Sequence, residues 1–267
     1  MTEEIIKHLM KEHGSILSSL TIGRLVIGKN FTAVQLSDGS CGLAGSEYTD
    51  RSQNIHPHER FFGNFASGNF RGAGVTELLN FNEDTRIAET VKIAVINAVS
   101  SAIGNEVYPV VRNTDTLDVL DLSGKKKITI VGAFHNYIKR LLQTNHELKV
   151  VELTLEALRS EHAHLFVPFS DSAEVLAQSD IVIMTGSSFV NRTFERLVGM
   201  CGANTFKVLI GPTGGMLPEF LFAKGIDVIG TTKIKDADLM FRIIEEGGSG
   251  FHLFEKSAEK ICIRRSN

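Results

Sequence analysis

Small polar residues and one histidine follow several apolar runs of the chain, at places where a strand is expected to end. They are Gly132, His135, Asn136, Glu152, Thr185, Gly186, Ser187, Gly211, Pro212 and Thr213. Hydroxyls, an imidazole and open backbone N–H groups can hold a polar or anionic ligand. We therefore expect a ligand-binding rim at these positions, although the residues indicate no particular reaction.

His135 stands three residues after Gly132, at the expected start of a helix. There an imidazole could ligate a metal ion, transfer a proton or bond an anion. The competing interpretation is a polar residue that opens the helix, and the sequence leaves both open. A strand-to-helix turn is fixed by its sheet, so we expect His135 to matter more than His56 or His58 on their long loop.

Two His-x-His pairs offer further metal ligands. His56 and His58 would face one way on an extended backbone, and Glu59 adds a carboxylate to this conceivable metal site. His162 and His164 have the same spacing. Such a pair alone is weak evidence for a metal, so a solvated polar segment is the favoured interpretation of both.

Glu152 lies twenty residues after Gly132, where dinucleotide-binding folds carry an acid that holds the ribose hydroxyls. However, residues 131–136 do not form Gly-x-Gly-x-x-Gly, and Phe134 would crowd a pyrophosphate. This disfavours NAD relative to another nucleoside-bearing ligand such as S-adenosylmethionine. A surface carboxylate at a strand end is favoured over both.

Gly186 and Gly211 each end an expected buried strand, where a ligand would approach the backbone. We expect glycine there because it tolerates a positive φ and leaves room that a Cβ would fill. The alternative is that both glycines serve only the packing of helix on strand.

An open, mostly parallel sheet must position these residues. Ile181–Met184 is an apolar run typical of a strand buried on both faces, and small residues then lead into a helix. Strands are expected at 128–131, 148–153, 181–184, 206–210, 226–230 and, at the edge, 251–254 and 260–264, with helices at 136–144, 173–178, 190–200, 217–223 and 237–246. Ligands of such sheets bind beyond the carboxyl ends of the strands.

The first part of the chain has a different, α+β pattern. Helices are expected at 3–20 and 84–103, and strands at 21–27, 31–36 and 41–44. Asp38-Gly39 between two strands is a hairpin signal, so we expect an antiparallel meander. The polar break at Ser123-Gly124 predicts two domains, 1–122 and 123–267. Residues 45–74 carry four phenylalanines that must pack, for which a seam between domains is suitable.

The composition excludes several classes of protein. The 267 residues carry a formal net charge of −3, without the basic field that nucleic-acid binding needs. Three isolated cysteines indicate neither a disulfide framework nor a thiolate zinc site. No apolar run reaches the ~20 residues of a membrane helix, and no signal-peptide core opens the chain. We expect a cytoplasmic protein, and the sequence leaves a homodimer open.

The set of motifs resembles a known family. Residues 179–193, followed by 208–213, resemble the heavy-metal chelation family DUF364, whose function is unknown. Residues 33–39, 42–44 and 94–98 resemble its usual N-terminal partner domain, DUF4213. The resemblance implies an α/β protein in which an enolase-N-terminal-like α+β domain precedes a Rossmann-like domain with a mostly parallel sheet. It also implies a site in the cleft between the domains.

The resemblance adds two residues to the candidate site. Asn191 and Thr193 match the family's Asn-x-Thr, and they could hydrogen-bond a ligand or brace the turn. The family usually continues Gly-Pro-Ser/Thr with Thr-Pro, whereas Gly214-Gly215 follows Thr213 here. This departure makes that loop more flexible and its ligand less certain.

Two function classes remain open from the sequence. The first is a protein that binds a small ligand, sequestering or delivering a divalent or heavy-metal ion or a metal chelate. The second is an enzyme that acts on a small molecule with a nucleoside-type cofactor such as S-adenosylmethionine, for example in a methyl transfer.

Overall fold

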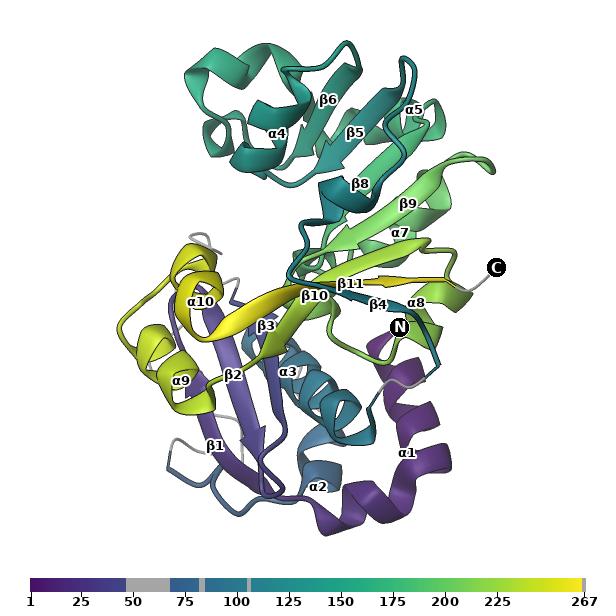
Figure 1. Cartoon of the computed structure of the whole chain (residues 1–267). Helices are drawn as coiled ribbons and strands as arrows, with labels where there is room; N and C mark the ends of the chain where they lie inside the picture. Colours follow the sequence, from purple (N-terminus) through teal and green to yellow (C-terminus); the bar gives the residue numbers. More distant parts are fainter. Residues whose placement is uncertain (47–67, 82–84, 105–106, 266–267) are drawn as a thin grey trace.

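The structure is a computed structural model that describes residues 1–46, 68–81, 85–104 and 107–265 (Figure 1). It is a mixed α/β structure with two sheets. The small sheet has the order β1-β2-β3, and the large sheet has the order β4-β11-β10-β9-β8-β5-β6-β7. No helix in these ranges is both long and apolar enough to cross a membrane.

The small sheet is the antiparallel meander that the sequence predicts. Its strands are β1 (Ile22–Ile27), β2 (Phe31–Leu36) and β3 (Cys41–Gly45), and its helices are α1 (Thr2–Ser19), α2 (Val75–Leu79) and α3 (Arg86–Ile103). Helix α3 packs tightly on β3, because a Cβ on Gly42 would lie only 2.2 Å from the Ala94 carbonyl oxygen. Thr85 caps α3 by accepting a hydrogen bond from the Ala88 N–H.

Six neighbouring strands of the large sheet, β7-β6-β5-β8-β9-β10, are parallel. They are β5 (Lys127–Val131), β6 (Glu147–Glu152), β7 (Phe166–Pro168), β8 (Ile181–Thr185), β9 (Phe206–Ile210) and β10 (Val228–Ile234). The antiparallel strand β11 (Ala258–Arg264) follows β10, and β4 (Val110–Arg112) forms the outer edge.

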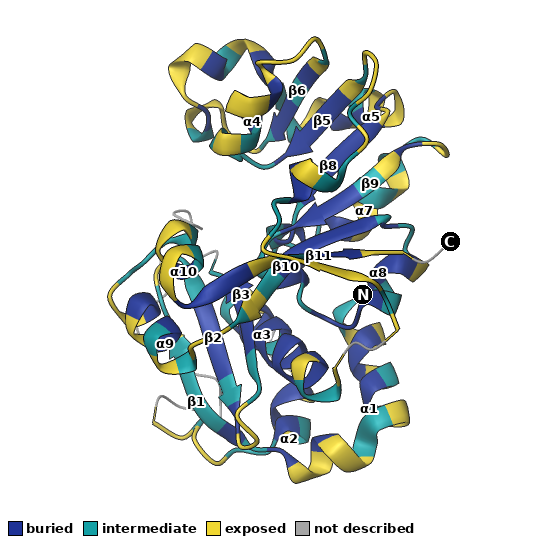
Figure 2. Cartoon of the chain, viewed as in Figure 1, coloured by how far each residue is buried: buried dark blue, intermediate teal, exposed yellow. Residues whose placement is uncertain are grey.

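Short helices connect these strands. They are η2 (Thr116–Val119), α4 (His135–Leu141), η3 (Leu155–Ala157), η4 (Ser160–Leu165), η5 (Phe169–Asp171), α5 (Ser172–Ala177), α6 (Ser187–Val190), α7 (Phe194–Met200), η6 (Pro212–Gly214), α8 (Pro218–Ala223), α9 (Ala237–Glu245) and α10 (Gly250–Lys256). The central strands are buried along most of their length (Figure 2). One continuous core joins α1 and α3 to one face of the large sheet.

Three expectations for the second half were wrong. Residues 251–254 are helical, because Ser249 and His252 form a capping box that starts α10. Residues 260–264 do not lie at an edge, since β4 pairs with their outer side. The expected helix 190–200 is broken into α6 and α7, and Arg192 adopts a φ of 60° at the break.

The division into domains 1–122 and 123–267 stays a prediction. Elements from each proposed domain pack with the other one. Residues 110–112 pair within the large sheet. Helix α9, from the end of the chain, packs against β1 and β2, and Figure 1 shows α9 and α10 beside the small sheet.

Candidate functional site

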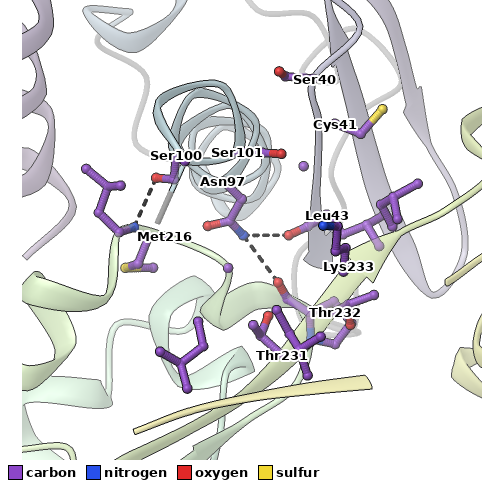
Figure 3. Close-up of a pocket in the computed structure, with 18 of the residues that line it drawn as sticks. Ser40, Cys41, Leu43, Asn97, Ser100, Ser101, Met216, Thr231, Thr232 and Lys233 are labelled. Carbon is purple, nitrogen blue, oxygen red and sulfur yellow. Dashed lines mark hydrogen bonds between the residues drawn. The ribbon is translucent and has the colours of Figure 1, made fainter. Parts of the chain in front are cut away.

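The small sheet and α3 meet the ends of β9 and β10 at a pocket of about 440 Å³, here called the central pocket (Figure 3). Cys41–Leu43 of β3 and Asn97 of α3 contribute to one side. The loop after β9 and residues 231–234 at the end of β10 contribute to the other. The pocket therefore lies beyond the carboxyl ends of two parallel strands, where sheets of this kind bind ligands.

Asn97 joins the elements around the central pocket. Its Nδ2 donates to the carbonyl oxygens of Leu43 (2.6 Å), Thr213 (3.0 Å) and Pro212 (3.3 Å). Because three acceptors surround this end of the amide, the nitrogen must face them, which fixes the orientation of the side chain. Oδ1 is left buried without a hydrogen-bond partner among the described residues.

Two threonines of β10 leave further oxygens unpaired. The hydroxyls of Thr231 and Thr232 are buried, and no described residue bonds to either. Both residues line the central pocket, although neighbouring side chains of a strand leave opposite faces. A buried polar group without a partner costs about 1–3 kcal/mol, and such groups are rare in folded proteins. Asn97, Thr231 and Thr232 all line the central pocket, so three of its lining residues carry a buried polar atom that the described residues leave unpaired.

Few metal-binding side chains line the central pocket. Cys41 is its one described cysteine, histidine or carboxylate residue, and its Sγ donates to the Gly39 carbonyl at 3.4 Å. Burial, with the nearby Asp38 carboxylate, raises the pKa of the Cys41 thiol to about 11, so the thiol is protonated at neutral pH. The described residues contain no cluster of three or more His, Cys, Asp or Glu side chains that could hold a metal.

The rim residues after β8 and β9 lie against the small sheet. The N–H of Gly45 donates to Thr213 Oγ1 at 2.9 Å, and Thr213 is only 2% exposed. A Cβ on Gly45 would lie 3.3 Å from Ser187 Oγ. Ser187 and Thr213 therefore contact β3 directly, while Pro212 is the one residue of the predicted rim that lines the central pocket.

The two rim glycines differ in their backbone. Gly211 has the expected positive φ, 117°, and its N–H donates to the Gly230 carbonyl. Gly186 has a φ of −61°, so the expectation of a positive φ is wrong there. Space favours glycine at position 186, since a Cβ would lie 3.0 Å from Thr213 Cβ and 3.2 Å from the Gly214 nitrogen. The Thr185 hydroxyl accepts from the Ser187 N–H at 3.2 Å within the same turn.

His135, in the rim after β5, does not line the central pocket and has Arg159 and His162 nearby. Its Nδ1 is buried without a described partner. Burial, and then the charges of Arg159 and His162, lower the pKa of His135. His162 is 8% exposed and also has an unpaired Nδ1. Asn136 is exposed.

Gly132 and Glu152 complete the rim after β5 and β6. Gly132 has a φ of 106°, and a Cβ there would lie 3.2 Å from Phe134 Cε2. The Phe134 ring therefore lies close to this turn. Glu152 accepts from the N–H of Leu153 at 2.9 Å, and burial raises the pKa of its carboxyl.

Asn191 and Thr193 brace a turn in the structure. Asn191 Oδ1 accepts from the N–H of Thr193 at 3.2 Å and from its hydroxyl at 2.6 Å. These bonds stabilise the break between α6 and α7. His56 and His58 lie outside the described residues.

The sequence reasoning missed Asn97 and Thr231 as site residues. Asn97 interrupts the apolar stretch Ala94–Ala98 of a helix that is otherwise buried on this face, which is a usable signal. A polar side chain at a core position needs partners, and here they lie far along the chain. Thr231 carries no such signal, because threonine is common in strands.

The sequence comparisons match each half of the chain to a family with the same description. Residues 115–263 match the family DUF364, and residues 10–100 match DUF4213; both carry the description "Putative heavy-metal chelation". The chain belongs to the DUF364 family. This DUF364 chain is also 27% identical to an uncharacterized protein of Methanocaldococcus jannaschii over 211 residues, which are 72% of this chain and 76% of that protein.

Two crystal structures of DUF364 proteins of unknown function resemble this one along its whole length. The protein from Pyrococcus horikoshii has a TM-score of 0.78 and 19% identity, covering 98% of this chain and 100% of its own. The protein from Desulfitobacterium hafniense DCB-2 has a TM-score of 0.72 and 18% identity, covering 99% and 98%. At these identities the likeness concerns the fold alone.

Proposed function

We propose that this protein binds a small polar ligand in the central pocket. One observation carries the proposal: Asn97 Oδ1 and the hydroxyls of Thr231 and Thr232 are buried without described partners, and all three residues line this pocket. A volume of about 440 Å³ lies within the range of small-molecule sites. We propose that this pocket is the cleft that the family resemblance implies, because residues from both halves of the chain line it.

A heavy metal would enter this pocket as a chelate. The family description names heavy-metal chelation. The protonated thiol of Cys41 is a poor ligand for a bare ion, since metals bind the thiolate. Polar side chains such as Asn97 instead suit the organic part of a chelate. Metal analysis of protein purified without an affinity tag tests this: stoichiometric metal that persists in the absence of any small organic molecule would contradict it.

The strand order supports a Rossmann-like assignment for the second half. In chain order the parallel strands read third-second-first-fourth-fifth-sixth across the sheet, which is the order of doubly wound dinucleotide folds. We propose this assignment, and an enolase-N-terminal-like one for the meander with its helices. The Phe134 ring lies close to the turn at Gly132, which weighs against a nucleoside cofactor there.

The substitution Thr231→Val tests the proposed site, because it keeps the shape of the side chain and removes the hydroxyl. We expect a ligand found in a thermal-shift screen of small polar metabolites to bind at least tenfold more weakly. The stability of the free variant should be unchanged or about 1 kcal/mol higher, since an unpaired buried hydroxyl is gone. Isothermal titration calorimetry and urea unfolding measure the two quantities.

Thr129→Val is the matched control. The Thr129 hydroxyl is bonded to Ser179 Oγ at 2.7 Å, and the residue does not line the central pocket. This variant should lose stability and keep its affinity for the ligand. A ligand that binds both variants as tightly as the parent would place binding elsewhere and overturn the proposal.

A further inference from the structure

The described lining of the central pocket is positively charged. It contains Arg112, Lys233 and Lys235, and among the described lining residues there is no aspartate or glutamate. This local excess contrasts with the formal net charge of −3 of the whole chain. A cleft lined by charge of one sign attracts ligands of the opposite sign.

The Glu259 carboxylate pairs with one of these cations. Glu259 Oε1 lies 3.3 Å from Arg112 Nη1, so this pair is locally neutral. Glu259 also faces Lys233 across the β10–β11 pair, but its carboxylate is already bonded to the arginine. Neither lysine ammonium has an ion-pair or hydrogen-bond partner in the part of the chain that the structure describes.

Both lysines are placed to meet a ligand at the mouth of the pocket. They are exposed, and they follow the buried Thr231 along the end of β10. Figure 3 shows Lys233 on the same strand end as Thr231 and Thr232, across the pocket from Asn97. Cationic groups at the mouth and unpaired oxygens in the wall form two different kinds of contact for one ligand.

We propose that the central pocket binds a small organic anion. Its carboxylate or phosphate group pairs with Lys233 and Lys235 at the mouth, and its hydroxyl or amide hydrogens donate to Asn97 Oδ1 and bond the Thr231 hydroxyl within. This inference rests on the proposed function and deepens it by naming the ligand class. Asn97 Oδ1 can only accept, so the ligand must carry a donor.

The same charges disfavour a bare metal cation at this place. Two uncompensated ammonium groups repel it, and no described carboxylate of the lining attracts it. A chelated metal fits only when the chelate carries a net negative charge, as a metal–polycarboxylate complex does. The charge of the ligand therefore distinguishes binding of a bare metal ion from binding of an anionic chelate. The family description does not separate these two modes.

The double variant Lys233→Gln/Lys235→Gln tests the inference with a panel of carboxylates and phosphate monoesters, each paired with its neutral amide or alcohol. In the parent we expect binding of an anion, with an affinity that falls as salt rises from 50 to 500 mM, because exposed charges are screened. The double variant should bind the same anion at least tenfold more weakly. Its melting temperature should stay close to that of the parent.

The control is Lys125→Gln/Lys139→Gln, which removes the same charge from two exposed lysines outside the pocket lining. It should keep the parent's affinity. If Lys233→Gln/Lys235→Gln binds the anion as tightly as Lys125→Gln/Lys139→Gln does, the inference is overturned. If the parent binds only neutral compounds and Thr231→Val abolishes that binding, the ligand is not an anion. The proposed function would then still hold. No binding by any member of the panel, anionic or neutral, would overturn both.

Discussion

Asn97 shows why the candidate site could be predicted only in part from the sequence. An asparagine inside an apolar helix face indicates a buried polar role, and that much is local information. Its three partners, however, lie 54, 115 and 116 residues away. Asn97 Oδ1 remains unpaired because of the way that β3, α3 and the loop after β9 meet. The central pocket is therefore a property of tertiary contacts, whereas the rim could be placed from strand ends alone.

His135 gives a prediction for the pH dependence of stability. Burial and nearby positive charge lower the pKa of His135 in the folded chain. Near pH 6.5, the ordinary value, the unfolded chain therefore binds more protons at this residue. The contribution of His135 to stability is complete above that pH and is lost progressively as the pH falls from there through the lower pKa of the folded chain. We expect His135→Asn to lose less stability than the parent between pH 7.5 and 5.5.

Urea unfolding at the two pH values measures this difference, and imidazole NMR titration reports the pKa of His135 directly. An imidazole that titrates above 6.5 would contradict the prediction. The proposed importance of His135 for ligand binding is a separate question, because the residue does not line the central pocket.

At the scale of helices and strands, local signals predicted the elements that depend on them. The Asp-Gly turn and the apolar runs correctly placed the meander and five parallel strands. Residues 251–254 were assigned wrongly because a short apolar segment fits either a strand or a helix, and its N-terminal cap decided the outcome. The position of β11 inside the sheet depends on pairing with residues 110–112, which no local pattern reveals.

The close contact between β3 and α3 predicts that a methyl group added at Gly42 lowers the stability of the fold strongly. A Cβ on Gly42 would lie 2.2 Å from both the Ala94 carbonyl oxygen and the Ala98 nitrogen. Backbone atoms of a helix cannot move aside as a flexible side chain would, so the helix must separate from the strand. We expect Gly42→Ala to cost more than about 3 kcal/mol in urea unfolding, above the ordinary range for overpacking.

Gly199→Ala is the control for that substitution. Gly199 lies in α7, and nothing lies within 4 Å of its added Cβ. Alanine favours a helix over glycine by about 1 kcal/mol, so this variant should be as stable as the parent or more stable. Equal stabilities of the Gly42 and Gly199 variants would show that β3 and α3 are farther apart than described.

At the scale of the whole molecule, the two sheets share their cores. Helix α9 carries Phe241, which is fully buried in a cluster with Ala33 and Leu43 of the small sheet. Arg24 of β1 lies over the Phe241 ring at 4.2 Å and also pairs with Glu245 at 2.7 Å. The largest core also contains residues from both halves of the chain. Neither sheet is buried without the other, so we expect the chain to unfold in one transition.

Phe241→Ala tests this cooperativity. Removing a buried phenylalanine should cost about 3–5 kcal/mol and lower the single melting temperature by roughly 10 °C, because α9 stabilises both sheets. Differential scanning calorimetry should give equal calorimetric and van't Hoff enthalpies for parent and variant. Phe251→Ala is the matched control, since this ring is 73% exposed on the neighbouring α10 and should leave the melting temperature unchanged. A scan with two transitions, of which Phe241→Ala moves only one, would mean that the two sheets fold independently.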